Sequence, residues 1–172
     1  GLSLVGSGEE VPVRFSIDAG TGTFGARITS NSGIPADRWT HVAVTFDSGS
    51  MSLYLNGELD AQTDNTDESI NDGGTALYLG TTEAANEQFF SGRIDEVRLW
   101  SDARTESEIQ SNYQQELVGN EDSREAYWRF NEVPGSPVSR AAAGRPKTVA
   151  LKGDAVTDNR TQPPVISGFT PT

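Results

Sequence analysis

Apolar and polar residues alternate along much of the chain, and this pattern predicts strands. Within residues 39–47, Val42, Val44 and Phe46 fall on one face at a period of two, with Ala and Thr on the other. Residues 52–55 repeat the alternation with two leucines. These two segments therefore predict neighbouring strands that each present an apolar face.

Two short turn motifs delimit these strands. Residues 47–50 (Asp-Ser-Gly-Ser) are typical turn residues, so they predict a hairpin between the two strands. Asn56-Gly57 is the strongest short hairpin signal that a sequence offers, because both residues tolerate positive φ. This pair is expected to form the central hairpin turn.

Similar alternation predicts further strands on both sides of this region. In residues 11–18, Pro12 indicates a strand start or an edge strand. The polar stretches 31–37, 60–74 and 81–88 predict turns and loops. The other expected strands cover residues 2–5, 26–30, 76–80, 90–100, 125–132 and 149–153.

One short helix is expected after the strand that ends at Trp100. Residues 105–108 (Thr-Glu-Ser-Glu) form a capping box, in which the Thr105 hydroxyl and the Glu108 carboxylate satisfy free N–H groups at the helix start. Ile109, Tyr113 and Leu117 then share one helix face over about three turns.

Three motifs in order resemble a known fold family. They are W-T-H-V-A-V-T-F from Trp39, L-Y-L-N-G from Leu53, and F-S-G-R-I-D-E-V-R-L-W from Phe90, followed by the short helix. Over roughly residues 1–115 the chain resembles the laminin-G-like, pentraxin-like jelly roll of the concanavalin A-like lectin group. The resemblance implies an all-β jelly-roll sandwich of two antiparallel sheets with one short helix.

The same resemblance suggests how the chain is divided. Residues 1–118 are expected to form the jelly roll. The front of the chain is short compared with the family, so the first strands are expected to be missing or to be supplied from elsewhere. Residues 119–157 are expected to pack back on this sandwich, the alternative being that they begin a second repeat. Residues 158–172 resemble a linker and the first strand of an immunoglobulin-like IPT/TIG domain, so neighbouring domains of the same chain are expected partners.

Composition narrows the partners that the chain can have. Net charge is −12, from 25 acidic and 13 basic residues, which disfavours nucleic acid and anionic membranes. No apolar run approaches the roughly 18 residues that span a bilayer, so direct membrane insertion is not expected, and no signal peptide is recognised at the start. The chain has no cysteine, which excludes disulfides and thiolate sites and is compatible with an extracellular or cell-surface bacterial protein.

The acidic residues do not form a recognisable catalytic pattern. Asp95 and Glu96 are adjacent, so on a strand they point to opposite faces and cannot act together on one sugar. The E-x-D-x-x-E spacing of related glycosidases does not occur. His41 is the single histidine and no G-x-S-x-G motif is present, so a packed His41 and a non-enzymatic protein are expected. Asp95 and Glu96 are interpreted as a structural pair bonded to loop backbone or to a neighbouring arginine.

Two acidic loops contain the oxygen ligands that Ca²⁺ prefers. The resemblance to pentraxins favours the loop with Glu83, Asn86 and Glu87, together with Asp95, as a site for one Ca²⁺ ion. Either loop is also compatible with a simple solvated segment. The second loop carries Asp64, Asp67, Glu68 and Asp72.

Aromatic residues offer a surface for a sugar ring. Tyr54 and Tyr78 are the candidate ligand-binding residues, whereas tryptophans on strands are usually buried in a core. We therefore expect a non-catalytic recognition or adhesion module. Its expected partner is a glycan, bound with Ca²⁺ support, or a protein on a cell surface. The alternative is a structural spacer of a surface fibre or array without a small ligand.

Overall fold

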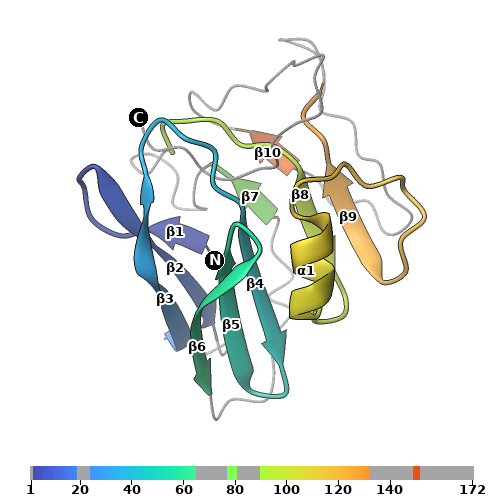
Figure 1. Cartoon of the computed structure of the whole chain (residues 1–172), viewed down its shortest axis with the longest axis horizontal. Coiled ribbons are helices and arrows are strands. Elements are labelled where there is room, and N and C mark those ends of the chain that lie inside the picture. Colours follow the sequence, from blue (N-terminus) through green and yellow to red (C-terminus); the bar gives the residue numbers. More distant parts are fainter. Residues whose placement is uncertain (1, 19–23, 65–76, 81–89, 132–148, 152–172) are drawn as a thin grey trace.

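The computed structural model describes residues 2–18, 24–64, 77–80, 90–131 and 149–151, and these form strands and one short helix (Figure 1). The all-β prediction is confirmed. No helix within these ranges has the length and apolar character needed to cross a membrane. The elements are β1 (Leu2–Leu4), β2 (Glu10–Asp18), β3 (Phe24–Pro35), β4 (Val42–Asp47), β5 (Ser50–Leu55), β6 (Glu58–Asp64), β7 (Leu77–Leu79), β8 (Val97–Trp100), α1 (Glu106–Asn112), β9 (Arg124–Trp128) and β10 (Val149–Leu151).

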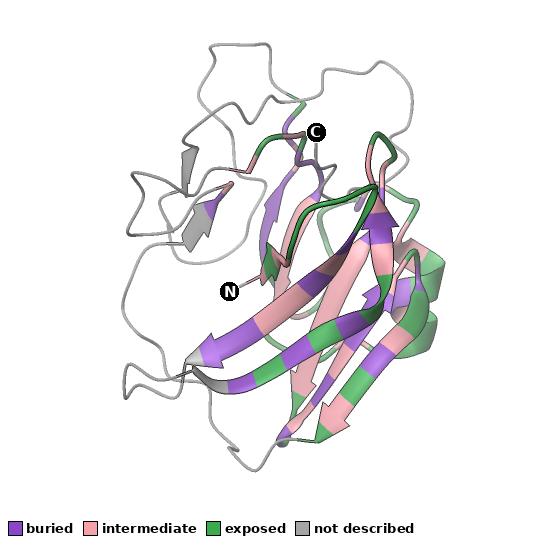
Figure 2. Ribbon diagram, turned by 90° about the vertical axis from the view of Figure 1, so that its left-hand side faces the viewer, coloured by how far each residue is buried: buried purple, intermediate pink, exposed green. Residues whose placement is uncertain are grey.

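Two three-stranded antiparallel sheets, β1-β2-β3 and β4-β5-β6, supply the main core. Buried and exposed residues alternate along β3, as the period of two requires (Figure 2). The buried side chains of both sheets meet in one apolar cluster, against which Val42, Val44 and Phe46 of β4 also pack. The buried members of this cluster are Val13, Ile17, Ala26, Ile28, Ile34, Met51, Leu53 and Ala61.

Strand β3 runs further than the sequence pattern predicts. Its pairing with β2 shifts between Pro12 and Arg14, and at this irregularity the Val13 N–H donates to the Ser30 hydroxyl at 2.8 Å. A side chain thus replaces a ladder bond, which lets the strand continue through polar residues. The predicted turn over residues 31–37 is therefore wrong for residues 31–35.

Strand β6 also extends beyond its predicted end. Residues 61–64 pair with β5 although their composition predicts a loop, and Asp60 lies at a register shift of this pairing. The Asp60 carboxylate accepts the backbone N–H groups of Asn31 (2.6 Å) and Ser32 (3.1 Å), so it links β6 to β3. Pairing with β5 and these bonds to β3 outweigh the weak strand propensity of the polar residues.

A second apolar cluster lies where β9 pairs with β8. Ala126, Trp128 and Phe130 share one buried face as predicted, and Trp128 is only 1% exposed. Strand β8 begins at Val97, so most of the predicted strand over residues 90–100 is irregular. Strand β10 pairs with β7 in parallel. The expected boundaries at residues 118 and 157 stay predictions, and residues 158–172 lie outside the described ranges.

Helix α1 has the predicted start and an earlier end. The Thr105 hydroxyl accepts the Glu108 N–H, and the Glu108 carboxylate accepts the Thr105 N–H, which confirms the capping box. These bonds from the Thr105 backbone and hydroxyl lower the pKa of Glu108. The helix ends at Asn112 with Tyr113 as its C-cap, so it has two turns rather than three.

The Tyr113 ring covers the turn between β5 and β6. Asn56 and Gly57 have φ values of 51° and 86°, as a two-residue hairpin turn requires. A Cβ atom added to Gly57 would lie 2.8 Å from the Tyr113 ring. Glycine is therefore needed here for both its conformation and its lack of a side chain.

We expect Gly57→Val to destabilise the fold by more than about 1 kcal/mol, because it adds backbone strain and displaces the Tyr113 ring. Gly6→Val is the matched control, since Gly6 also has positive φ (101°) but no atom within 4 Å of an added Cβ. Chemical denaturation of both variants should show the larger loss at Gly57. Equal losses would mean that the ring moves aside without cost.

Removal of all residues after Val118 should lower the melting temperature by about 10 °C or more. The deletion removes Trp128 and Phe130, and burial of each large side chain stabilises by roughly 1.5–3 kcal/mol. A chain that ends at Thr157 retains every described strand and should melt almost like the full chain. If the shorter chain melted normally, residues 119–157 would be independent of the sandwich.

Candidate functional site

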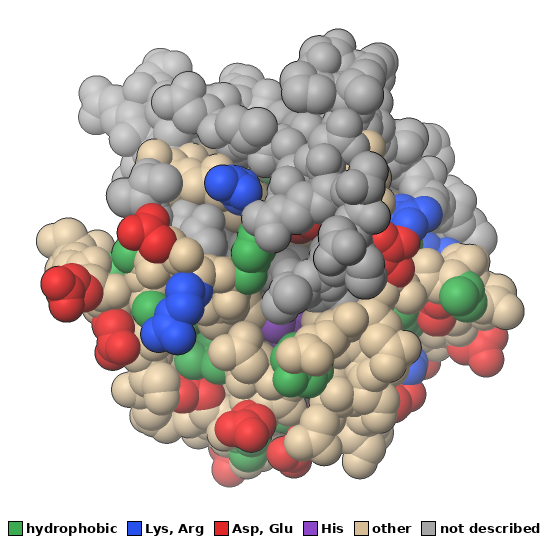
Figure 3. Space-filling model, turned by 45° about the horizontal axis from the view of Figure 1, so that its top comes forward, with side chains coloured by type: hydrophobic (Ala, Val, Ile, Leu, Met, Phe, Trp, Pro, Cys, Tyr) green, Lys and Arg blue, Asp and Glu red, His purple; other side chains and the backbone are tan. Residues whose placement is uncertain are grey.

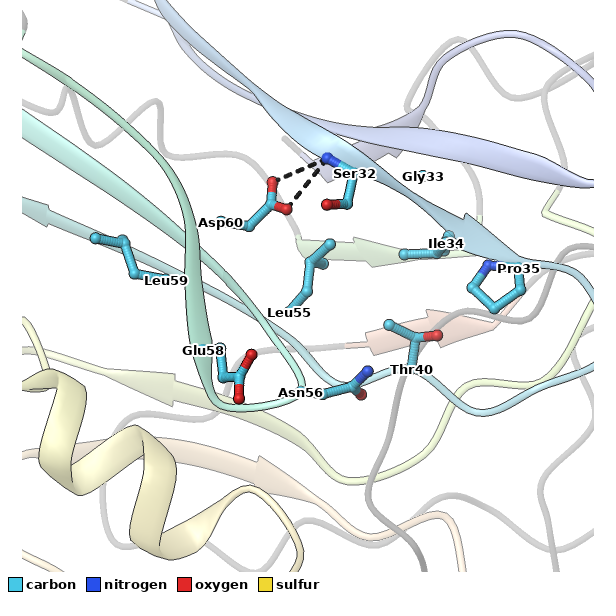
Figure 4. A pocket seen from close by; sticks show the side chains of 10 residues that line it. All are labelled: Ser32, Gly33, Ile34, Pro35, Thr40, Leu55, Asn56, Glu58, Leu59 and Asp60. Atoms are coloured by element: carbon cyan, nitrogen blue, oxygen red, sulfur yellow. Dashed lines mark hydrogen bonds between the residues drawn. The ribbon is translucent and has the colours of Figure 1, made fainter.

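A groove lies between the edges of β3 and β6, near the Asn56-Gly57 turn (Figure 4). Its volume is about 380 Å³. It lies beside the bonds from Asp60 to β3, so the approach of the two sheets creates it. The lining residues are Ser32, Gly33, Ile34, Pro35, Thr40, Leu55, Asn56, Glu58, Leu59 and Asp60.

Apolar side chains form part of the groove surface. Ile34 is fully buried and Leu55 is half-buried, so both also belong to the packed interior. Leu59 is 43% exposed, which is unusual for a large hydrophobic side chain in this protein. The Leu59 side chain points to the other side of β6 from Glu58 and Asp60, so the accessible apolar surface of the groove comes from Pro35 and Leu55 (Figure 4).

The Asp60 carboxylate is occupied by the fold. One oxygen accepts the Asn31 N–H, and the Ser32 N–H lies within 3.3 Å of both oxygens. The Asn31 side-chain amide also donates to the Asp60 carbonyl. These bonds hold β3 against β6, so Asp60 shapes the groove and carries its charge rather than moving freely within it.

Asn56 and Glu58 supply the polar groups at the turn. The Asn56 Oδ1 atom accepts the His41 N–H at 3.0 Å, and the Asn56 N–H donates to the His41 carbonyl at 2.9 Å. Oδ1 is thus used within the fold, and the Nδ2 amide group is the hydrogen-bond donor that this side chain offers. Glu58 is exposed and forms no ion pair within the described residues. The groove therefore combines a hydrogen-bond donor with a neighbouring acceptor.

Two acidic residues line the groove. Glu58 and Asp60 lie two residues apart on β6. Both Asp60 oxygens accept backbone N–H groups, so Asp60 is fixed in place, whereas Glu58 is exposed. Sequence reasoning missed the groove, although the period-two spacing of these two acids was a visible signal.

A laminin-G model described as the concanavalin A-like lectin/glucanases superfamily matches residues 2–110. The chain belongs to the concanavalin A-like lectin/glucanases superfamily. The resemblance that the three motifs indicated is thus confirmed. The superfamily name covers both binding proteins and hydrolases, so membership by itself leaves the activity of this member open.

One solved structure has a similar fold, and a second matches less well. A candidate carbohydrate binding protein from Bacteroides ovatus has a TM-score of 0.54 and 23% identity, over 71% of this chain and 34% of its own. An S-layer domain-containing protein from Clostridium thermocellum has a TM-score of 0.42 and 21% identity, over 64% of this chain and 62% of its own. The chain thus spans about a third of the first protein and under two thirds of the second. No curated protein matches the chain.

In this superfamily member, Asp95 and Glu96 are structural. Glu96 has φ of 51°, so the assumption that the pair lies on a strand is wrong, and both side chains are buried. Glu96 forms a 3.0 Å ion pair with Arg98 and accepts the Tyr127 hydroxyl. Asp95 Oδ1 accepts the Glu96 N–H at 2.9 Å. The prediction that they bond to backbone and to a neighbouring arginine is confirmed.

Arg98 and Tyr127 connect Glu96 to α1 and to the segment that follows it. Arg98 donates to the carbonyls of Asn112 (3.0 Å), the last residue of α1, and of Gln115, three residues further along. The Tyr127 hydroxyl accepts the Leu117 N–H at 3.2 Å. Burial, followed by the Glu96 carboxylate, raises the pKa of Tyr127, so the phenol stays protonated. Glu96, Arg98 and Tyr127, here called the buried triad, therefore join β8, α1 and β9.

The predicted Ca²⁺ ligands cannot be assembled from the described residues. Glu83, Asn86 and Glu87 lie outside the described ranges, and Asp95 is only 5% exposed. Within the described ranges, no three acidic or histidine side chains are grouped as metal ligands. Among the described residues, no set of Ca²⁺ ligands therefore surrounds Asp95, and the calcium site stays a prediction.

The predicted aromatic platform is not formed as expected. Tyr54 on β5 is only 7% exposed, so the expectation that it is exposed is wrong. The Tyr78 side chain lies outside the described residues. Trp128 is in the core as predicted, whereas Trp100 is half-buried and stacks with Arg104, whose guanidinium carbon lies 4.5 Å from the ring centre.

His41 is packed against the helix, as expected. It is buried, its ring centre lies 5.8 Å from that of Tyr113, and its Nδ1 atom has no hydrogen-bond partner among the described residues. Burial, and then the positive charge of Arg98, lowers the pKa of His41 from 6.5 to about 4. His41 is therefore neutral in the folded protein near pH 7.

This shift predicts a loss of stability in acid. Between pH 6.5 and about pH 4 the unfolded chain binds a proton at His41 that the folded chain excludes, so the free energy of unfolding should fall by about 3 kcal/mol as the pH falls through this range. Urea unfolding at pH 7 and pH 4 measures the change. His41→Gln cannot titrate and should lose correspondingly less stability. An identical pH dependence in both proteins would contradict this role of His41.

Proposed function

We propose that this chain is a non-catalytic glycan-binding module of an extracellular or cell-surface, multidomain bacterial protein. The observation that carries the proposal is the groove between β3 and β6, in which half-buried Pro35 and Leu55 lie with the polar groups of Asn56 and Glu58. Membership in a superfamily named for lectins supports glycan as the ligand. The Bacteroides ovatus protein with the same fold, described as a candidate carbohydrate binding protein, supports the same ligand class.

The charge distribution supports this assignment over other partners. On the face shown in Figure 3, acidic side chains are scattered over the described surface and no broad basic patch occurs among the described residues. Nucleic acid and anionic lipid need such a patch. A neutral ligand such as a glycan, or a surface protein, has no such requirement.

A glycan array with the full chain tests the proposal. We expect reproducible binding of a defined group of glycans without release of reducing ends. Hydrolysis of a bound glycan would show an enzyme. An absence of binding on an array that contains diverse plant, bacterial and animal glycans would favour a structural spacer.

Calcium support is a separate part of the proposal, and it rests on Glu83, Asn86 and Glu87 in the loop that precedes Phe90. Millimolar Ca²⁺ acting on a micromolar site would stabilise the fold by about 4 kcal/mol, which should raise the melting temperature by several degrees. The double variant Glu83→Gln/Glu87→Gln should abolish this shift.

The matched control is Asp67→Asn/Glu68→Gln, which removes two charges from the other acidic loop. A shift that disappears only in this control would place the ion in that loop instead. No shift in the unaltered protein, with no bound metal by elemental analysis, would remove calcium from the proposal.

A further inference from the structure

The polar groups of the groove are arranged for ligands that both donate and accept hydrogen bonds. Asn56 presents Nδ2 as a donor, because its Oδ1 is bonded to the His41 N–H at 3.0 Å. Glu58, two residues along the chain, presents a carboxylate that only accepts. A sugar carries hydroxyl groups that serve both, since one can donate to Glu58 and another can accept from Asn56. A bond from a hydroxyl to a carboxylate is charge-assisted and therefore strong for its kind.

The charges of the groove exclude another class of ligand. Glu58 and Asp60 line it, and none of the ten lining residues is Lys or Arg. The Asp60 charge is fixed in place by its bonds to the N–H groups of Asn31 and Ser32. A uronate or sulfated sugar would bring a third negative charge without a cation to pair with it, which opposes binding.

We propose that the groove between β3 and β6 selects uncharged, hydroxyl-rich glycans over uronate and sulfated ones, with Asn56 and Glu58 as the residues that determine this specificity. The inference rests on the proposed glycan-binding function and adds the ligand class and the residues. Pro35 and Leu55, which are half-buried and line the groove, supply the apolar contact for the ring, and Asn56 and Glu58 bind the hydroxyl groups at its edge (Figure 4).

The test uses the full chain and matched oligosaccharides that differ only in charge, such as mannose against mannuronic acid oligomers and glucose against glucuronic acid oligomers. We expect at least one neutral series to bind about tenfold more tightly than its uronate partner in titration calorimetry at low salt. Raising the ionic strength should narrow this ratio, because the discrimination is electrostatic.

Two nearly isosteric variants test the residues. Glu58→Gln keeps an acceptor but loses its charge, so binding of neutral glycan should weaken several-fold and the discrimination against uronate should shrink. Asn56→Asp keeps the oxygen that accepts the His41 N–H but replaces the donor by a carboxylate, so neutral binding should fall about tenfold. Asp122→Asn is the control, since Asp122 is exposed and does not line the groove. Unchanged melting temperatures would show that the variants remain folded.

The outcomes separate the two proposals. Weaker binding in both groove variants, with Asp122→Asn unchanged, supports the inference. Equal or tighter binding of uronates, or neutral binding that neither groove variant alters, overturns it and leaves the glycan-binding function standing. If neither neutral nor charged glycans bind, the inference falls together with the proposed function.

Discussion

The buried carboxylate of Glu96 is the group on which the described part of the structure depends most. Its ion pair with Arg98 and its bond from the Tyr127 hydroxyl remove it from water with partners on β8 and β9. Loss of one partner of such a buried pair typically costs about 3–5 kcal/mol, because the remaining charge is left uncompensated. The positive φ of Glu96 shows that the backbone itself bends to place the carboxylate there.

The effect of this carboxylate extends from the second apolar cluster to the groove. Arg98 also donates to carbonyls at the end of α1, which fixes the helix where Tyr113 covers Gly57. That contact positions the turn, and the turn carries Asn56 and Glu58 into the groove. A region that looks remote from the ligand therefore sets the geometry of the residues that we propose to bind it.

Asp60 shows how a charged residue can hold two sheets together. Its carboxylate lies in the groove, two residues from Glu58, and accepts backbone N–H groups from β3. These bonds join β6, at the edge of one sheet, to β3, at the edge of the other. The same contact shapes the groove that lies beside it.

The sequence by itself determined the fold class, the central Asn56-Gly57 turn, the capping box of α1 and the buried face around Trp128. These features depend on local conformation and on residue periodicity, which a single chain displays directly. The strand ends at residues 31–35 and 60–64 were not predictable in this way, since they depend on pairing with distant partners. Tyr54 was wrongly predicted to be exposed for the same reason, because the burial of a strand residue depends on the segments that pack over it. Only the tertiary structure decided the groove and the buried triad, because both arise where segments far apart in the sequence meet.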